Sequence, residues 1–318
     1  MRCFVTGCAG FVGSNLTDRL LALGHEVVGF DNLSTGSRRF LQEAELSSRF
    51  RFVEGDLLQP TELSEPISGT DVVFHMAANA DVRFGVQHPI KDLHQNTIAS
   101  VNLLEAMRVS DVKRIVFAST GSVYGEADVF PTPEDAPFPV QTSLYGASKL
   151  AAEAFIEAYS EAFGIQAFLF RFVSLLGNRY SHGHIIDFCR QLRRDPHYLR
   201  VLGNGKQRKS YLDIADCIEG MLLALENCRA KINIFNLGTD EYCEVDDSIR
   251  WICEEMQVTP RIEYSGGDRG WIGDNPFIFL DCSAIRTLGW QPKLSIREGV
   301  VKTVRYLLDN PELLQASS

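Results

Sequence analysis

The stretch RCFVTGCAGFVGSNLTDRLLALG (residues 2–24) decides the fold class. Its apolar start predicts a short strand, and the helical spacing of apolar residues further on predicts a helix that stops at a glycine. Between them lie Gly7, Gly10 and Gly13, spaced as G-x-x-G-x-x-G. Glycines allow a tight turn there and let backbone amides approach a pyrophosphate at the helix start. The stretch therefore predicts a dinucleotide-binding unit; the alternative is a glycine-rich turn without a ligand.

The alternation of strand and helix patterns continues through the first half of the chain. Brief β-branched and aromatic runs predict strands at residues 25–31, 50–56, 70–78, 112–120 and 165–172. Helices are expected near residues 92–108 and 144–164. Strands that are apolar on both faces fit a parallel sheet covered by helices. The predicted fold class is therefore α/β, with a Rossmann-type doubly wound parallel sheet.

The pattern changes after residue 172, where Gly, Asn and basic residues interleave in loop-rich segments. We expect residues 1–172 to form the dinucleotide-binding domain. Residues 173–318 are expected to form a smaller α/β substrate-binding region at the C-terminal side of the sheet, where open α/β sheets bind ligands. A further strand pattern, KINIFNLG, indicates that the chain returns to the large sheet near residues 210–238, so the two parts are interleaved.

The composition narrows the class of protein. The chain has 318 residues, of which 45% are hydrophobic and 23% charged, and its formal net charge is −10. This charge argues against nucleic acid or an anionic membrane as the main partner. The sequence starts directly with a strand pattern and has no apolar run of membrane-spanning length, so the cytoplasm is the expected location. Eight cysteines without a C-x-x-C pair or a histidine cluster predict no metal site.

Two acidic residues are expected to meet the adenosine half of a dinucleotide. Asp31 ends the second predicted strand, where a carboxylate accepts hydrogen bonds from the ribose hydroxyls and repels a 2′-phosphate. This favours NAD over NADP. Asp56, in EGDLL, is placed at the end of the next strand and is expected near the adenine; the alternative is a turn aspartate.

The stretch SLYGASKLAAE (residues 143–153) carries the candidate chemistry. Tyr145 and Lys149 stand one turn apart on one face of the predicted helix, where an ammonium group favours the phenolate. Tyr145 is therefore a candidate general base; the alternative is an exposed helix start with an ordinary Tyr and Lys. FASTGSVYGE is expected to bring Ser119, Thr120 and Ser122 into the cleft at the same sheet edge, although such residues also form turns and caps.

Taken together, the motifs resemble one family. The glycine loop, Asp31, HMAANADV, FASTGSVYG, YGASK and GNGKQRKSYLDIAD occur in the order of the extended short-chain dehydrogenase/reductase family, in its nucleotide-sugar epimerase/dehydratase branch. The resemblance covers essentially the whole chain. It implies tightly held NAD and a catalytic set on Thr120, Tyr145 and Lys149. It also implies cofactor contacts from Gly7, Gly10, Phe11, Val12, Gly13, Asp31, Asn32, Asp56, Leu57, Ala77, Ala78, Asn96, Tyr145, Lys149 and Phe172.

The resemblance also implies a reaction. Lys149 would bind the nicotinamide ribose and, with the positive ring of oxidised NAD, lower the pKa of Tyr145. The phenolate would then take the proton of a sugar hydroxyl while the carbon beneath gives a hydride to NAD, and Thr120 would hydrogen-bond the same oxygen.

Two residues after Thr120 separate the members of the branch. The 4,6-dehydratases carry Asp-Glu there and the related decarboxylases carry a Glu, whereas this chain has Gly121 and Ser122. The pattern therefore favours epimerisation at C4 of a UDP-hexose through a 4-keto sugar, as in the UDP-galactose 4-epimerases. The alternatives are a nucleotide-sugar dehydratase or another sugar-modifying oxidoreductase, and, in a different class, a non-catalytic NAD-binding regulator.

The same resemblance suggests substrate contacts. Arg269, in GGDRGWIGD, resembles the diphosphate-binding arginine of the family, and Lys209 occupies the place of a second arginine with Arg208 beside it. Ser174 replaces an asparagine that helps to hold the substrate phosphates in the family, and Arg83 is expected to reach the substrate.

The remaining expectations concern histidines and assembly. His75, His182 and His184 are interpreted as structural residues rather than as proton carriers. Relatives dimerise through helices that correspond to residues 92–108 and 144–164, so a homodimer is expected by analogy.

Overall fold

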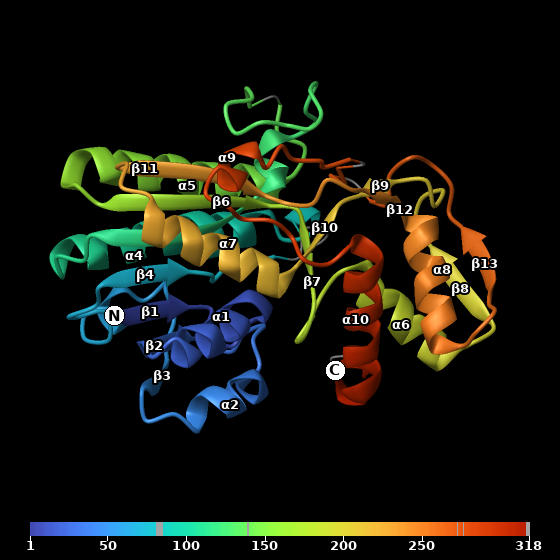
Figure 1. The fold of residues 1–318 in the computed structure, drawn as a ribbon, viewed down its shortest axis with the longest axis horizontal. Coiled ribbons are helices and arrows are strands. Elements are labelled where there is room, and N and C mark those ends of the chain that lie inside the picture. The colour runs from blue at the N-terminus through green and yellow to red at the C-terminus, as the bar shows by residue number, and fades with distance from the viewer. Residues whose placement is uncertain (81–84, 139, 272, 276, 316–318) are drawn as a thin grey trace.

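A computed structural model of the chain describes residues 1–80, 85–138, 140–271, 273–275 and 277–315, and it confirms the α/β class. Its centre is a parallel sheet of seven strands in the order β11-β6-β5-β4-β1-β2-β3 (Figure 1). The strands are β1 (Arg2–Thr6), β2 (Glu26–Asp31), β3 (Phe50–Glu54), β4 (Val72–His75), β5 (Arg114–Thr120), β6 (Gln166–Phe172) and β11 (Ile232–Leu237). All seven lie within stretches that the sequence pattern predicts as strands.

The strand order reverses beside β1, which lies between β2 and β4. Val5 pairs in register with Gly29 on one side and with Phe74 on the other. Ligands of open α/β sheets bind at the carboxyl ends of the strands beside such a reversal. Those ends point toward the smaller group of elements on the right of Figure 1.

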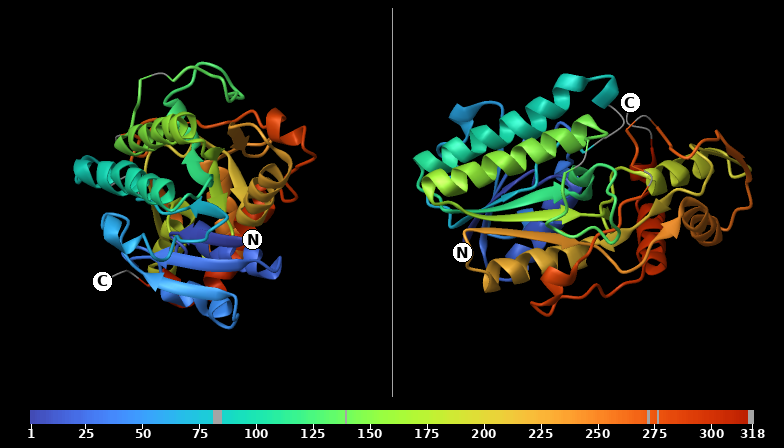
Figure 2. Two further views of the ribbon diagram at one scale, coloured as in Figure 1. Left: turned by 90° about the vertical axis from the view of Figure 1, so that its left-hand side faces the viewer. Right: turned by 90° about the horizontal axis from the view of Figure 1, so that it is seen from above.

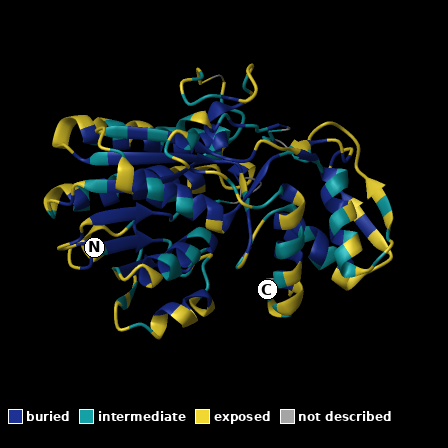
Figure 3. Cartoon of the chain, viewed as in Figure 1, coloured by how far each residue is buried: buried dark blue, intermediate teal, exposed yellow. Residues whose placement is uncertain are grey.

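Helices cover both faces of the sheet. One face holds α4 (Ala99–Val109) and α5 (Leu144–Phe163), which lie side by side in Figure 2, and the other holds α1 (Phe11–Ala22) and α7 (Ile214–Asn227). Neighbouring strand residues alternate between two cores: Phe117 packs with the first pair of helices, and Val116 packs with the second. This alternation buries the inner strands on both faces, as Figure 3 shows, and explains their continuous apolar runs.

The helix expected near residues 92–108 starts earlier and has three parts. They are α3 (Pro89–Asp92), a π-helical stretch η4 (Leu93–Ile98) and α4. Short π-helical stretches inside helices often occur at functional sites. Other short helices among the described residues before β6 are η1 (Arg38–Leu41), α2 (Gln42–Glu45), η2 (Pro60–Glu62) and η5 (Gly121–Tyr124).

The second half of the chain is more regular than the loop-rich sequence suggests. Two-stranded pairs join β7 (Ser174–Leu176) with β10 (Tyr211–Asp213), β9 (Arg208–Lys209) with β12 (Cys243–Glu244), and β8 (Tyr198–Val201) with β13 (Arg261–Tyr264). Helices α6 (His184–Arg194), α8 (Val245–Met256) and α10 (Ile296–Asp309) pack together beside them. The last short helices are α9 (Ser283–Arg286) and η6 (Pro311–Leu314). The division of the chain into two domains stays a prediction.

Candidate active site

The glycine loop between β1 and α1 packs backbone against backbone. Gly7 has a left-handed φ of 66°, and a Cβ atom there would lie 2.7 Å from the Cα and N atoms of Ala77. A Cβ atom at Gly13 would lie 2.0 Å from the carbonyl oxygen of Gly7. The Gly10 amide donates to the same oxygen over 3.0 Å and closes the turn. A side-chain-free turn at the start of a helix fits the pyrophosphate of a dinucleotide.

Asp31 ends β2 and is bound to the glycine loop. Its Oδ2 accepts the Ala9 amide over 2.9 Å, and its Oδ1 accepts the Leu33 amide over 2.8 Å. Burial raises the pKa of Asp31, and these two hydrogen bonds oppose the rise. The predicted ribose acceptor and the predicted pyrophosphate loop are thereby held together.

Asn32 and Asp56 adjoin each other on the same side of the sheet. Asn32 Nδ2 donates to Asp56 Oδ2 over 3.2 Å, and Asp56 Oδ1 accepts the Leu58 amide over 2.9 Å. Asp56 lies two residues beyond the end of β3, so its placement at the strand end was wrong by two residues. The bond to Leu58 is that of an Asx turn, which agrees with the alternative of a turn aspartate. Leu57, which lies between Asp56 and Leu58 in the chain, is buried.

The other predicted cofactor positions gather at the same edge. Phe11 and Val12 begin α1, and Ala77 and Ala78 follow β4. Phe172 is the last residue of β6. Each therefore lies at the carboxyl end of a strand or at the start of the helix after the glycine loop.

Asn96 lies in the π-helical stretch and is completely buried. Its Oδ1 accepts the Asn79 amide over 2.8 Å, and its Nδ2 donates to Ser148 Oγ over 2.9 Å and to the Asn79 carbonyl over 3.3 Å. Asn96 thus joins the loop after β4 to the helix that carries Tyr145 and Lys149. Its side-chain bonds position these segments.

Tyr145 and Lys149 lie in the first two turns of α5. Ser143 caps the helix by accepting the Gly146 amide over 3.0 Å, which fixes where the helix begins. Lys149 is buried, its Nζ donates to the Ala118 carbonyl over 2.8 Å, and it lies 4.5 Å from the centre of the Phe117 ring. Burial lowers the pKa of Lys149 to about 7, although the Glu153 carboxylate acts in the opposite direction.

In the chain alone, the net effect of the surroundings is to raise the pKa of Tyr145, and Lys149 is not among the main causes; the depression expected with NAD bound stays a prediction. Burial raises the pKa of Tyr145 to about 12, and Asp92 adds to the rise, while a hydrogen bond with Thr120 lowers it. The physical reason is that the phenol loses more by leaving water than it gains from Thr120. The Lys149 ammonium is meanwhile directed at a backbone carbonyl. A further positive charge is needed to make Tyr145 a base near neutral pH.

The three hydroxyl residues at the end of β5 and just beyond it have different surroundings. Thr120 is partly buried and caps η5: its Oγ1 accepts the Ser122 amide over 3.1 Å and lies 3.2 Å from Ser122 Oγ. Ser119 is buried and donates to Glu153, so its expected place in the cleft was wrong. The reason is the alternation of the strand, which directs neighbouring side chains to opposite faces.

Two of the predicted substrate cations meet around one acidic residue. Lys209 Nζ lies 3.0 Å from Asp274 Oδ1 and donates to the Asn275 carbonyl over 3.0 Å. Arg269 donates to the Asp274 carbonyl over 3.3 Å and pairs with Glu126 at 2.7 Å. The structure therefore brings Lys209 and Arg269 together, and sequence reasoning missed Asp274 as the residue between them. The segment DRGWIGD carries two aspartates six positions apart, and the second of them is Asp274. Acidic residues are too common in loops for this spacing to have identified Asp274 as a site residue.

The other substrate candidates lie in different settings. Arg208, the neighbour of Lys209, places its guanidinium carbon 3.8 Å from the centre of the Phe277 ring and 5.5 Å from that of Tyr242. Ser174 begins β7 and is exposed. Arg83 lies outside the described residues.

The three histidines considered in the sequence have different surroundings. His75 is buried between Thr6 Oγ1 at 2.8 Å and Ser100 Oγ at 2.9 Å, and burial lowers its pKa to about 3. His184 lies 3.0 Å from Ser248 Oγ, and burial likewise lowers its pKa to about 3. Both rings are therefore neutral at pH 7. The third, His182, lies with its Nδ1 3.1 Å from Ser181 Oγ.

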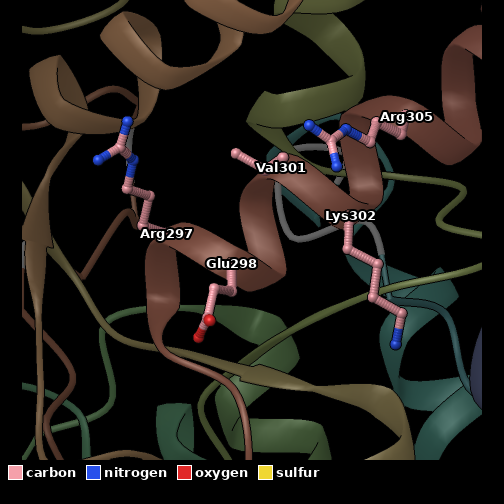
Figure 4. A pocket seen from close by; sticks show the side chains of 5 residues that line it. All are labelled: Arg297, Glu298, Val301, Lys302 and Arg305. Carbon is pink, nitrogen blue, oxygen red and sulfur yellow. The ribbon is translucent and has the colours of Figure 1, made fainter.

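A hollow of about 400 Å³ on α10 is a second basic feature of the surface (Figure 4). Its lining comprises Arg297, Glu298, Val301, Lys302 and Arg305. The three cations are paired with Glu254, Asp213 and Glu255, respectively, at 2.6–3.1 Å. This pairing balances their charge, so the hollow is a weaker anion site than its composition suggests.

Two kinds of feature are absent from the described part of the chain. No helix there has the length and apolarity needed to cross a membrane. Among the same residues, no group of three or more His, Cys, Asp or Glu side chains is arranged as metal ligands are.

Known proteins align with this chain over nearly its whole length. UDP-glucose 4-epimerase of Mycolicibacterium smegmatis is 32% identical over 313 residues, which cover 96% of this chain and 98% of that protein. A crystal structure of UDP-galactose 4-epimerase is 37% identical, has a TM-score of 0.88, and covers 98% of this chain and 99% of its own. UDP-glucuronic acid 4-epimerase from Bacillus cereus, solved with UDP-glucuronic acid and NAD, is 28% identical, with a TM-score of 0.89 and coverage of 98% and 100%.

The family comparison covers most of the chain. Residues 3–238 match the NAD dependent epimerase/dehydratase family, a range that runs from β1 through the glycine loop, Tyr145 and Lys149 to the end of β11. Together with relatives aligned over nearly their full length, this shows that the chain belongs to the NAD dependent epimerase/dehydratase family.

Proposed function

We propose that this chain inverts C4 of a UDP-hexose, using NAD and a transient 4-keto sugar. The observation that carries the proposal is the position of Tyr145 at the start of α5, one helical turn before the buried Lys149, on a helix that packs against β5, the strand that ends at Thr120. These residues lie at the sheet edge that also holds the glycine loop and Asp31. The names of the relatives support a nucleotide-sugar epimerase.

Each residue of the set has a distinct task. Tyr145 takes the proton of the sugar 4-hydroxyl, Thr120 holds the same oxygen by a hydrogen bond, and Lys149 supplies a positive charge beside the site. NAD held by the glycine loop and Asp31 would supply hydride exchange with C4 and a positive ring charge that favours the phenolate. Tyr145 returns its proton to the oxygen in the second half-reaction, so the overall reaction is redox-neutral.

The residues after Thr120 favour epimerisation over elimination. Gly121 is buried, and a Cβ atom there would lie 2.6 Å from the side chain of Ile278. Ser122 is engaged with Thr120. Neither position carries a carboxyl group that moves a second proton, as a dehydratase requires.

Proton NMR of sugar nucleotides incubated with the protein tests the function. UDP-glucose is expected to give UDP-galactose and the reverse, with UDP-glucuronic acid and the N-acetyl hexoses as further substrates to be assayed. Inversion at C4 with retention of the 6-hydroxyl supports the proposal. Loss of that hydroxyl would identify a dehydratase. Bound NAD without turnover of any of these compounds would favour a non-catalytic regulator.

Lys209 and Arg269 are proposed to bind the substrate diphosphate, together with Ser174 and Arg83 as sequence-based candidates. We expect Lys209→Ala to raise KM about tenfold to a hundredfold with a smaller change in kcat, because a charge-assisted contact to phosphate is lost. Lys206→Ala is the matched control, since Lys206 is exposed and pairs with Glu244 and Asp246. Initial rates against substrate concentration measure both constants. An unchanged KM for Lys209→Ala would remove this residue from the substrate site.

We also propose that two copies of the chain associate through α3, η4, α4 and α5. Several apolar side chains of these helices are 41–56% exposed, namely Ile90, Leu93, Ile98, Leu144 and Phe155. Burying them against a second copy removes apolar area from water. Wild-type protein is expected to sediment with the mass of a dimer, and Phe155→Glu with a smaller average mass. A single-chain mass for wild type at micromolar concentration would contradict the proposal.

A cytoplasmic location stays a prediction from the sequence.

A further inference from the structure

A buried line of alternating charge extends from Lys149 into the core. Glu153 follows Lys149 by one turn on α5, and Arg171 faces it from β6, with both side chains of this pair 2% exposed. Arg171 donates from Nη2 to Glu153 Oε2 over 2.8 Å and from Nε to both carboxylate oxygens over 3.1 and 3.2 Å. A cation, an anion and a cation are thus enclosed in series.

Strand β5 holds the first two members of this line at consecutive residues. The Ala118 carbonyl accepts the Lys149 ammonium, and the next residue, Ser119, donates its hydroxyl to Glu153. The carboxylate is therefore fixed beside the lysine by the same strand that carries Thr120.

Arg171, at the end of the line away from Lys149, is also held by several hydrogen bonds. Arg171 donates from Nη1 to Tyr124 Oη over 2.8 Å and to the Glu134 carbonyl over 2.9 Å. Tyr124 in turn donates to Asn236 Oδ1 over 2.9 Å. Arg171 thereby stays in place to compensate Glu153, because a buried carboxylate without a partner would take up a proton.

We propose that Glu153, held by Arg171, is a positioning residue that keeps the buried Lys149 side chain charged beside Tyr145. The need for that charge rests on the proposed function. A carboxylate one turn away opposes the loss of charge that burial imposes on an amine.

The other groups around Lys149 do not replace this carboxylate. His75 on β4 is neutral at pH 7, and on β5 the Phe117 ring and the Ala118 carbonyl carry only partial charge. Tyr145 on α5 is protonated near neutral pH, and Asp92 on α3 acts on Tyr145. Glu153 is thus the full negative charge that acts on Lys149 within the described surroundings.

Titration of Lys149 in the purified protein tests the inference directly. The chemical shift of ¹³Cε-labelled lysine is followed against pH, with the spectrum of Lys149→Met to identify the resonance, and with NAD content matched between samples. We expect Glu153→Gln to lower the midpoint for Lys149 by about 1 to 2 pH units, because two buried cations then lack their anion. Glu153→Asp, which keeps the charge, is expected to titrate close to wild type.

Glu157→Gln is the matched control, because it makes the same charge change one turn further along α5 at a partly exposed residue. Its Lys149 midpoint is expected to stay close to wild type. An unchanged midpoint in folded Glu153→Gln, or an equal shift in both variants, would overturn the proposal. A purely structural role of the ion pair predicts lower stability without a selective shift of Lys149.

A second variant covers the case in which Glu153→Gln does not fold. Glu153→Gln combined with Arg171→Gln replaces the ion pair by two neutral amides, which a core tolerates better than one unpaired ion. Its Lys149 midpoint is expected to lie below those of wild type and Glu157→Gln, and a wild-type midpoint would overturn the proposal. These titrations do not depend on turnover. Failure of the wild-type chain to epimerise any sugar nucleotide would therefore refute the proposed function separately.

Discussion

Tyr145→Phe is expected to lower turnover about a thousandfold or more while leaving NAD bound to the purified protein. The change removes one oxygen atom, and with it the group that takes and returns the proton of the sugar hydroxyl. The rest of the site, including the Lys149 contact with Ala118 and the glycine loop, is left in place. The measurement is kcat for UDP-hexose interconversion by NMR, together with the NAD content released by acid.

The control for this prediction is the same substitution elsewhere on the same helix. Tyr159 lies on α5 beyond Glu153, and its hydroxyl hydrogen-bonds Glu105 on the neighbouring helix. Tyr159→Phe is expected to retain wild-type turnover and NAD content. Turnover of Tyr145→Phe within tenfold of wild type would remove Tyr145 from the proton transfer. Loss of NAD together with turnover would instead assign Tyr145 to binding.

The pKa values of the site explain why NAD is part of this expectation. Burial raises the pKa of Tyr145 to about 12, and the Thr120 hydrogen bond offsets only part of this rise. In the chain alone, Tyr145 is therefore protonated near neutral pH. A positive charge bound near the phenol favours the phenolate, so the base is made available when cofactor and substrate are together.

The sequence predicted the sheet well because its strands repeat one physical pattern. The inner strands are short runs that are apolar on both faces, and the two cores on either side of Phe117 and Val116 require such runs, whereas the edge strand β3 is partly exposed. The glycine loop was equally clear, because its spacing follows a strand and precedes a helix. These features depend on neighbouring residues, which a sequence pattern records directly.

The parts that the sequence did not predict depend on contacts between distant residues. Ser119 and Thr120 are neighbours with the same chemistry, yet only the structure shows that Ser119 faces Glu153 in the core. Glu153 itself stands in the quoted stretch SLYGASKLAAE, one turn after Lys149, but its partner Arg171 lies 18 residues further along the chain. The pKa of Tyr145 depends on burial, which spacing does not reveal.

Gly13→Ala is expected to give protein without bound NAD that also unfolds at a lower temperature. The added Cβ atom would lie 2.0 Å from the Gly7 carbonyl oxygen, 2.7 Å from its carbonyl carbon and 2.9 Å from the Cys8 Cα atom. All three are backbone atoms of the glycine loop, so no flexible side chain can move aside. The loop must shift away from α1, and its backbone amides are then no longer placed to bind the pyrophosphate.

Gly10→Ala and Gly299→Ala make this a graded test. A Cβ atom at Gly10 would lie 3.2 Å from the Gly7 carbonyl oxygen, and one at Gly299 on α10 would only reach ordinary contact, 3.4 Å from Leu176 Cδ1. NAD content and melting temperature are therefore expected to fall in the order Gly299→Ala, Gly10→Ala, Gly13→Ala. The last variant should melt about 5 °C or more below wild type. Stoichiometric NAD in Gly13→Ala would show that the loop can open without cost, which contradicts the close packing of its backbone.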